Sequence, residues 1–493
     1  MNFKTPEECG ISSANIERFI RSIQDRNLFI HNVVIAKGDS IIFEKYWAPF
    51  HENFLHRQYS ITKSIVALAV GFAEQDGLVD LDAPISRYFP EECKNVKCEL
   101  LAQQTVREML SMRTALLAEN WFEGVKDDRV KFYFENTKID DKRPGGTIYN
   151  YDSSGSFVLC AMVERVTGKT FMDYMREKCF DKIGVSPEAT CLTCPGGHSW
   201  GDSALLCTAR DLLKMARFTM NLGKWEGEQL LNENYVKTAV SKVTDNNKSF
   251  RYEHNSLGYG YQIWRTYDDS FFFNGMGGQL AVCVPHKDLI LICNGDNQGE
   301  NNFNAKKNII DAFFDIIVRE EHDISGAEAK QASLFEYTKD FKLATIIGEA
   351  YSPFAERING KTFVLDKNKM NIKWIKFTFN GGRSTMEYEN ATGVKTIYFG
   401  MGENAFDKFP EEGYSDLVGA MYAPGNFYDC AVSGAWIEPQ KLGVFVQVID
   451  KYFGRLSMQF GFKDENTVGI YMLPEAENFF CEYSGYAAGY AEK

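Results

Sequence analysis

The stretch from Ser64 to Ala73 is apolar or small on nearly every side when it is drawn as a helix. A helix that is apolar all round belongs inside a protein rather than on its surface. Gly77 follows shortly afterwards, and glycine is the usual residue just past a helix end. The sequence therefore predicts a buried helix that begins near residue 60 and ends before Gly77.

Ser60 and Lys63 stand three residues apart at the start of this helix, so their side chains share one face and can meet. A serine hydroxyl is a weak nucleophile until a neighbouring base takes its proton. Lysine can be that base, because apolar surroundings and the positive helix end disfavour its ammonium form. The free N–H of Ser60 can also help to hold an oxyanion. Such a tetrapeptide also arises by chance in a long chain, so the motif alone stays a hypothesis.

The bulk properties of the chain limit the classes of function. Its 493 residues favour two or three domains, and its 44% hydrophobic and 14% aromatic content exclude a disordered protein. The net charge of −13 argues against nucleic acid or an anionic membrane as partner, because both would be repelled. Residues 1–8 carry acids and no apolar core, and no run reaches the length of a membrane span. We therefore expect a cytoplasmic protein without membrane segments.

The 12 cysteines are scattered along the chain, as expected for reduced thiols that serve in packing. Cys191 and Cys194, with His198 just beyond, are the one arrangement that suggests a metal or redox site. A zinc site needs four ligands, and no second cysteine pair of matching spacing occurs. We favour a loop with chance thiols, and expect neither a metal nor an organic cofactor.

The first 320 residues are predicted to form strands, then helices, then strands and a final helix. Residues 31–47 read as a hairpin turned at Gly38 and Asp39. Helices are expected after Ser153 and after Thr208, which forms a capping box with Asp211. This order suits an antiparallel sheet built from both ends of the segment, with a helical region inserted between them. The later elements are expected as strands over 259–266, 270–274, 279–284 and 289–294 and a helix over 302–320.

Residues 319–330 are polar and mark a boundary, so we expect a first domain over 1–330 and a second over 331–493. Beyond about residue 355 the sequence alternates between apolar and polar residues in about eight segments, which suggests a small antiparallel barrel or sandwich. A barrel of that size either holds a small ligand or is filled with side chains. We expect a filled one.

Two further stretches are candidates for chemistry. Tyr151 and Ser153 lie two apart on a polar loop, so both can point into one cleft if the loop is extended. A tyrosine there can carry protons between nucleophile and leaving group. Residues 275–279 are glycine-rich and approach a strand, so their backbone N–H groups can face a substrate carbonyl. Tyr151 is, however, one of 24 tyrosines, and 275–279 equally suits a plain hairpin turn.

Together, Ser60-x-x-Lys63, Tyr151-x-Ser153 and the stretch 275–279 resemble, in order and separation, the three motifs of the serine β-lactamase-like family. That family includes class C β-lactamases, DD-peptidases and related esterases and amidases. The resemblance covers about residues 7–318 and implies an α+β fold, with an antiparallel sheet flanked by helices and an all-helical insertion. The C-terminal region resembles the lipocalin-like barrels that follow this domain in some members.

The resemblance implies that Ser60 is the acylated nucleophile, Lys63 its base and Tyr151 the second proton carrier. The N–H groups of Ser60 and Gln279 would form the oxyanion hole. Ser153 stands where the family has an asparagine. The expected residues around the substrate are Ser153, Met276, Gly278, Gln279 and Tyr259.

Two departures shape the expected function. Serine at 153 removes an amide that both donates and accepts hydrogen bonds. Met276 stands about where the family has a lysine or histidine, and methionine cannot pair with a substrate carboxylate. We therefore do not expect efficient β-lactamase or DD-peptidase activity, and predict hydrolysis of an uncharged ester or amide of a small molecule.

Two other functions stay open at this point. Met276 and Ser153 also suit a catalytically impaired binding protein that keeps the fold. Alternatively, the barrel itself carries the main function by holding a lipophilic ligand. The sequence leaves the oligomeric state open, a homo-oligomer included.

Overall fold

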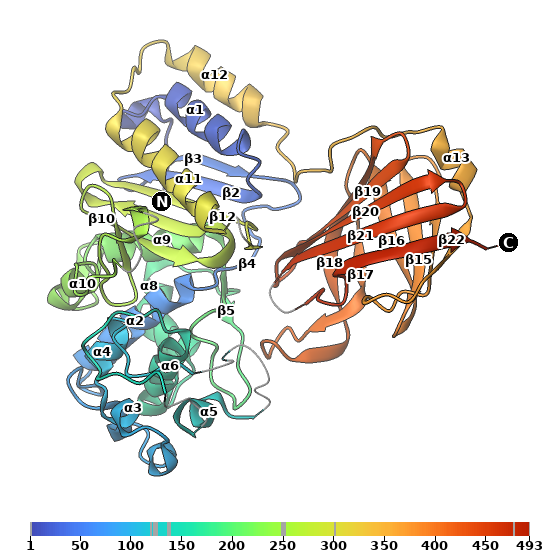
Figure 1. Ribbon diagram of the computed structural model, residues 1–493. Coiled ribbons are helices and arrows are strands. Elements are labelled where there is room, and N and C mark those ends of the chain that lie inside the picture. Colours follow the sequence, from blue (N-terminus) through green and yellow to red (C-terminus); the bar gives the residue numbers. More distant parts are fainter. Residues whose placement is uncertain are drawn as a thin grey trace. The chain divides into compact units, whose positions relative to one another are not determined.

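The computed structural model describes residues 2–118, 121, 127–135, 140–247, 253–299, 302–476 and 479–492. The chain divides into two compact units, each with its own secondary structure (Figure 1). The first comprises Met1–Lys342 and Asp416–Met421, and the second comprises Leu343–Ser415 and Tyr422–Lys493.

The helices and strands of the described residues follow largely the order predicted from the sequence. The helices are α1 (Ser13–Gln24), α2 (Ile61–Gln75), α3 (Glu99–Gln103), α4 (Val106–Leu110), α5 (Arg129–Glu135), α6 (Ser153–Thr167), α7 (Phe171–Met175), α8 (Asp181–Ile183), α9 (Ala209–Met220), α10 (Glu233–Ala239), α11 (Asn302–Phe313), α12 (Ala327–Thr338) and α13 (Phe354–Ile358). The strands of the first unit are β1 (Asn2–Phe3), β2 (Ile30–Lys37), β3 (Ser40–Tyr46), β4 (His56–Arg57), β5 (Thr190–Cys191), β6 (Leu205–Cys207), β7 (Lys224–Trp225), β8 (Glu228–Gln229), β9 (Trp264–Thr266), β10 (Ser270–Gly275), β11 (Gln279–Val284) and β12 (Leu289–Gly295).

A seven-stranded sheet in the order β1-β3-β2-β12-β11-β10-β9 forms the centre of the first unit. All its pairs are antiparallel except β1 with β3. Strands β2 and β12 lie side by side, so the two ends of the segment meet in one sheet, which confirms the prediction. The predicted strand over 259–266 is wrong in its first part, because only Trp264–Thr266 pairs as a strand in the sheet.

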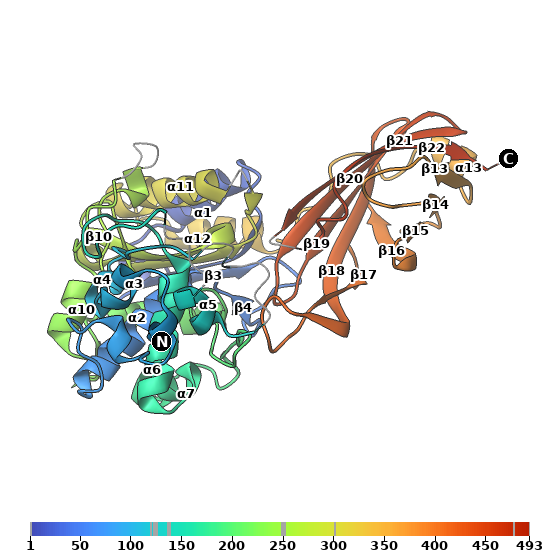
Figure 2. The same ribbon diagram turned by 60° about the horizontal axis from the view of Figure 1, so that its bottom comes forward.

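Helices cover both faces of this sheet (Figures 1 and 2). On one face α1 and α11 pack on the strands through a shared apolar core, and α12 lies against α1. On the other face α9 contacts β2, β11 and β12. The helical region on that side includes α2 and α6, which pack against each other. The core residues of the first face include Phe19, Ile35, Leu291, Ile309 and Phe313.

Helix α2 is buried over its first thirteen residues, which confirms the prediction from its all-round apolar sequence. Gly71 allows Tyr235 of α10 to approach, because a Cβ there would lie 2.4 Å from the tyrosine ring. The Tyr235 hydroxyl donates to the Ala67 carbonyl at 2.6 Å. Gly77 has a φ of 72° just past the helix end, as its position predicts. Ser60 and Lys63 thus lie at the start of a helix that is packed against its neighbours on every side.

The second unit is a β-barrel in which nine strands close and β17 extends from β18. The closure is a parallel contact between β16 and β18, whereas the other pairs are antiparallel. The strands are β13 (Thr362–Leu365), β14 (Trp374–Thr378), β15 (Arg383–Asn390), β16 (Gly393–Met401), β17 (Ala405–Tyr414), β18 (Tyr422–Glu438), β19 (Lys441–Val448), β20 (Gly454–Asp464), β21 (Thr467–Ala476) and β22 (Gly485–Ala491).

Large side chains occupy the core of this barrel, and the fully buried ones include Phe363, Phe377, Phe399, Met458 and Phe460. A pocket of about 570 Å³ in the same unit is lined largely by polar and charged residues, among them Glu411, Glu412 and Glu482. Such a lining offers little to a lipophilic ligand.

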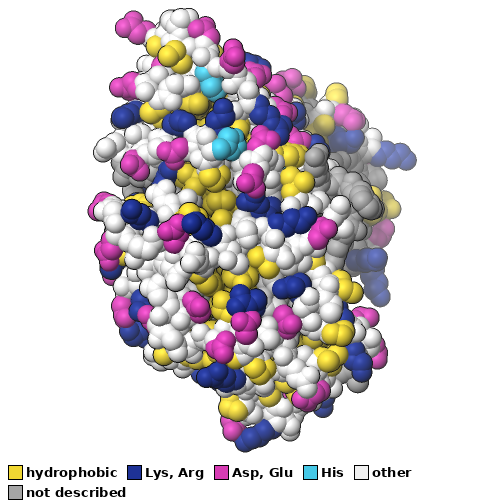
Figure 3. Space-filling view, turned by 90° about the vertical axis from the view of Figure 1, so that its left-hand side faces the viewer, with side chains coloured by type: hydrophobic (Ala, Val, Ile, Leu, Met, Phe, Trp, Pro, Cys, Tyr) yellow, Lys and Arg dark blue, Asp and Glu magenta, His cyan; other side chains and the backbone are white. Residues whose placement is uncertain are grey.

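The surface shows no large field of one charge on the face drawn in Figure 3, where basic and acidic side chains alternate and apolar groups are small. Within the described residues, none of the helices is both long enough and apolar enough to cross a bilayer.

Candidate active site

The residue before the candidate nucleophile has a strained backbone. Tyr59 has a φ of 46°, in the left-handed region that costs a non-glycine residue about 1–3 kcal/mol. Its ring is 2% exposed and lies under the Arg57 guanidinium, 4.6 Å from ring centroid to Cζ. Ser60 then takes helical angles as the N-cap of α2, but its hydroxyl does not cap the helix. The hydroxyl is therefore available for a different contact.

That contact is with Lys63. Lys63 Nζ donates to Ser60 Oγ at 3.0 Å and to the Asp202 carbonyl at 2.5 Å. Only 1% of Lys63 is exposed, so its amine is almost fully removed from water. Burial of this kind disfavours a charged amine unless partners compensate. The structure thus places the two residues of the first motif within hydrogen-bond distance, with Lys63 buried and Ser60 half-buried.

Tyr151 reaches the same amine from the loop before α6. The Lys63 Nζ lies 5.2 Å from the centroid of the Tyr151 ring, and this ring packs against Trp264 at a centroid separation of 5.7 Å. In the described part of the chain the Tyr151 hydroxyl forms no hydrogen bond, so the ring rather than the hydroxyl faces Lys63. Catalytic hydrogen bonds are often loose without substrate. The Tyr151 ring lies beside the Lys63 amine, and its role as a proton carrier stays a prediction.

The glycine-rich stretch lies beside the segment that leads into Ser60. A Cβ on Gly275 would lie 2.4 Å from the Gln58 carbonyl, so only glycine permits this approach. Gly277 and Gly278 have φ values of 80° and 96°, which glycine adopts without strain. The Gln279 side chain donates to the Met276 carbonyl at 2.6 Å and to the Gly295 carbonyl at 2.8 Å. The buried Gln279 amide thus holds the turn, and its backbone N–H stays the oxyanion candidate.

The other predicted residues differ in their surroundings. Ser153 is the half-buried first residue of α6, which Asp152 caps through a bond from the Gly155 N–H at 3.0 Å. Met276 is half-buried in the helical turn Met276–Gly278. Tyr259 is fully buried, and burial raises the pKa of its phenol well above the usual value. It contacts Trp264, with ring centroids 5.1 Å apart, so it supports the aromatic group around Tyr151.

A buried amide ties the helices around the site together. The Gln262 side chain donates to the carbonyls of Met109 and Leu110 at 3.0 and 3.1 Å. The Gln262 side-chain oxygen accepts from the Ser156 hydroxyl at 2.7 Å, and the Gln262 backbone carbonyl accepts from the Ser64 hydroxyl at 2.7 Å. One residue thereby joins α2, α4 and α6. The central position of Gln262 was not apparent from the sequence.

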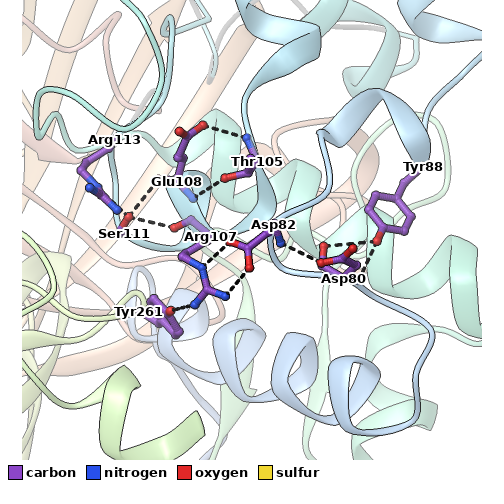
Figure 4. Close-up of polar contacts among 9 residues, drawn as sticks. All are labelled: Asp80, Asp82, Tyr88, Thr105, Arg107, Glu108, Ser111, Arg113 and Tyr261. Carbon is purple, nitrogen blue, oxygen red and sulfur yellow. Dashed lines mark hydrogen bonds and ion pairs between the residues drawn. The ribbon is translucent and has the colours of Figure 1, made fainter.

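Helix α4 is held in place from the outside by a polar network (Figure 4). Arg107 donates to both carboxylate oxygens of Asp82, at 2.7 and 2.8 Å, and to the Tyr261 hydroxyl at 2.6 Å. Arg113 donates to the Ser111 hydroxyl at 3.0 Å and to the Gly146 carbonyl at 3.0 Å. The network therefore links the stretch before Tyr151 to the stretch that carries Gln262.

Sequence patterns did not indicate a buried group of charged and aromatic residues beside Lys63. Asp202 is fully buried, and burial raises the pKa of its carboxyl while Lys63 and Arg129 act in the opposite direction. Arg129 is 1% exposed and lies over the rings of Trp121 and Trp200, at 5.1 and 5.2 Å. The only available signal was the rarity of fully buried charges, which a sequence does not reveal before the fold is known.

Cys191 ends β5, and Cys194 lies in the segment that follows. His198 Nδ1 pairs with a Glu164 carboxylate oxygen at 2.7 Å. Burial raises the pKa of the Cys191 thiol and that of the Cys194 thiol well above the usual value. Across the described ranges, no group of three or more His, Cys, Asp or Glu side chains is placed to hold a metal ion.

His56, in the strand just before Ser60, is expected to make the stability of this region sensitive to acid. Its Nδ1 lies 3.0 Å from the Arg57 carbonyl and its Nε2 lies 2.8 Å from His31 Nδ1. Burial lowers the pKa of His56 from 6.5 to about 3. The unfolded chain therefore takes up a proton that the folded chain excludes between these values. The free energy of unfolding should fall as the pH drops from about 6.5 towards 3.

Urea unfolding of the wild type and of His56→Gln at pH 7.5 and pH 5 tests this expectation. The midpoint of the wild type should fall more between the two pH values than that of His56→Gln. An equal fall in both proteins would show that His56 does not carry this sensitivity.

The chain is similar in sequence to known proteins. A family model described as Beta-lactamase matches residues 31–312, more than half of the chain. A "6-aminohexanoate-dimer hydrolase" from Paenarthrobacter ureafaciens is 23% identical over 278 residues, which cover 52% of this chain and 70% of the relative.

Two solved structures share the fold of the first unit. A penicillin-binding protein homolog from Caulobacter crescentus matches with a TM-score of 0.51 and 16% identity, covering 64% of this chain and 99% of that one. "EstCE1, a hydrolase with promiscuous acyltransferase activity" matches with a TM-score of 0.51 and 14% identity, covering 61% and 98%. With the family model matched over most of the first unit, the chain belongs to the Beta-lactamase family.

Proposed function

We propose that this protein is a serine hydrolase that cleaves an ester or amide bond of a small molecule through an acyl-enzyme on Ser60. The observation that carries the proposal is the 3.0 Å contact between Lys63 Nζ and Ser60 Oγ, in a place where Lys63 is 1% exposed. Membership of the Beta-lactamase family and the hydrolases among its named relatives support it.

In the proposed reaction, the neutral Lys63 amine takes the Ser60 hydroxyl proton while Oγ attacks the substrate carbonyl carbon. The N–H groups of Ser60 and Gln279 hold the resulting oxyanion. The tetrahedral intermediate then expels the alcohol or amine, which leaves protonated with Tyr151 as the proton carrier. Water attacks the acyl-enzyme, releases the carboxylic acid and returns the proton to Ser60.

The substrate is proposed to lack a carboxylate next to the scissile bond. Met276 stands in the turn of the third motif, and its thioether cannot pair with an anion. A panel of short-chain aryl esters, D-amino-acid amides and nitrocefin tests both parts of the proposal. Turnover of an ester or amide with slow or absent nitrocefin hydrolysis is expected. Nitrocefin as the best substrate would refute the proposed substrate class.

Replacing Tyr151 by phenylalanine removes the phenol and keeps the ring that lies 5.2 Å from Lys63 Nζ and packs on Trp264. If the hydroxyl carries protons, kcat should fall about 100-fold with little change in KM. Steady-state kinetics on the best ester of the panel measures both constants. Wild-type kcat in Tyr151→Phe would leave the ring as the only contribution of this residue.

The alternative is a binding protein with impaired chemistry, which Met276 and Ser153 motivate. The two functions differ in one result: a binding protein neither turns over any member of the panel nor reacts at Ser60 with a fluorophosphonate.

A further inference from the structure

The Lys63 amine is held by two oxygens, and the second belongs to a residue with its own buried charge. The Asp202 carbonyl accepts from Lys63 Nζ at 2.5 Å. The Asp202 carboxylate is fully buried, and its Oδ2 accepts from the Trp121 indole N–H at 3.4 Å. Its Oδ1 has no hydrogen-bond partner among the described residues. A carboxylate in this position needs a compensating cation.

Arg129 is the cation that completes this arrangement. It is 1% exposed, and its guanidinium lies over the rings of Trp121, which also donates to Asp202, and of Trp200, at 5.1 and 5.2 Å. Its Nε and Nη1 have no hydrogen-bond partner in the part of the chain that the structure describes. Arg129 and Lys63 both act on the Asp202 carboxyl and lower its pKa against the effect of burial. The carboxylate thus lies in the field of two cations.

The other groups around Lys63 add little to the opposed charges of Asp202 and Arg129. Arg57 lies 4.8 Å from the Trp200 ring and donates to the Ser203 carbonyl at 3.1 Å, so its guanidinium is held by other partners. Tyr151 presents its ring. Three buried thiols lie close enough to Asp202 to feel its charge: Cys160, Cys191 and Cys194. Burial raises the pKa of each thiol well above neutrality, so the thiols carry no charge. Glu164, which acts on two of these thiols, is paired with His198.

Each half of the pair alone would shift the protonation of the Lys63 amine, in opposite directions. An uncompensated carboxylate beside Lys63 stabilises the ammonium form, which cannot take a proton from Ser60. An uncompensated guanidinium beside Lys63 destabilises the ammonium form and so lowers the pH at which the amine becomes neutral. Because both charges are buried, their effects are weakly screened by solvent.

We propose that Asp202 and Arg129 act together as a positioning pair for Lys63: the Asp202 carbonyl orients the amine, and the two opposed charges set the pH at which it becomes available as a base. This rests on the proposed function, since it concerns how Lys63 serves Ser60. Neither residue is proposed to touch the substrate.

The test uses the variants Asp202→Asn and Arg129→Met and the double variant in the full-length protein. The pH dependence of kcat/KM, and of the rate of Ser60 labelling by a fluorophosphonate, is measured for each. Asp202→Asn should move the acid limb to lower pH and Arg129→Met to higher pH, each by about one unit. The double variant should return towards the wild type. A structural role alone would lower rates without moving the limbs in opposite directions.

Two further variants keep the proposal falsifiable. Arg129→Lys retains the charge and should keep the wild-type limb, even if it folds less stably than the wild type. Glu233→Gln removes an exposed carboxylate that pairs with Lys237 on α10, and should move nothing. Unmoved limbs, or limbs that move in the same direction, in folded Asp202→Asn and Arg129→Met would overturn the pair while labelling of wild-type Ser60 still supports the proposed function. A wild type that neither turns over substrate nor labels would overturn both.

Discussion

Ser60→Ala should lower kcat by roughly 10⁴- to 10⁶-fold, because no other group can form the acyl-enzyme. The fold should survive this change. The Ser60 hydroxyl does not cap α2, and its recorded contact is the one with Lys63 at 3.0 Å. Steady-state kinetics on the best ester, together with circular dichroism, separates loss of chemistry from loss of structure. Wild-type turnover in Ser60→Ala would remove Ser60 from the mechanism.

A neighbouring serine on the same helix supplies the matched control. The Ser64 hydroxyl donates to the Gln262 carbonyl at 2.7 Å, inside the protein. Ser64→Ala should lower stability through the loss of this bond and retain the ability to be acylated. If Ser64→Ala lost acylation as completely as Ser60→Ala, the effect of both variants would be structural.

Lys63→Met should lower kcat by about 10²- to 10⁴-fold, with KM little changed, because the base is absent when the hydroxyl must lose its proton. Methionine has a similar length and suits a site where the lysine is 1% exposed. Methionine also removes the cost of burying a polar amine, so the melting temperature should not fall greatly. Kinetics and thermal unfolding on the same preparation measure the two effects.

Lys63→Arg distinguishes a base from a fixed positive charge. Arginine keeps the charge but stays protonated at every accessible pH, so it cannot accept the serine proton. The variant should be as slow as Lys63→Met at all pH values. Substantial activity in Lys63→Arg would mean that position 63 contributes electrostatic stabilisation and that another group takes the proton.

Local sequence patterns predicted most of the fold. The hairpin of β2 and β3 and helix α6 follow from residues that are close in the chain, since alternation, capping residues and glycine at the ends are local signals. The strand expected from residue 259 failed because the apolar residues there form a buried aromatic group with Tyr149 instead of a ladder. The second unit has ten strands, nine of which close the barrel, where about eight were expected; the closure is a parallel contact that no alternating pattern encodes.

The candidate site was predictable where a motif marks it, and not beyond. Ser60 and Lys63 are neighbours on one helix turn, so their contact follows from spacing. Asp202 lies 139 residues from Lys63, and its contact depends on how distant segments fold together. Arg129 likewise gains its place from the tryptophans around it. A sequence shows which residues are charged, but not which charges are buried together.

The central claim is that Ser60 is the activated nucleophile of this protein. Mass spectrometry after reaction with a fluorophosphonate, followed by mapping of the labelled peptide, tests it most directly. A single adduct on Ser60, absent in Ser60→Ala and strongly slowed in Lys63→Met, is the predicted result. An adduct on another residue, or ester hydrolysis that continues while Ser60 stays unmodified, would contradict the claim.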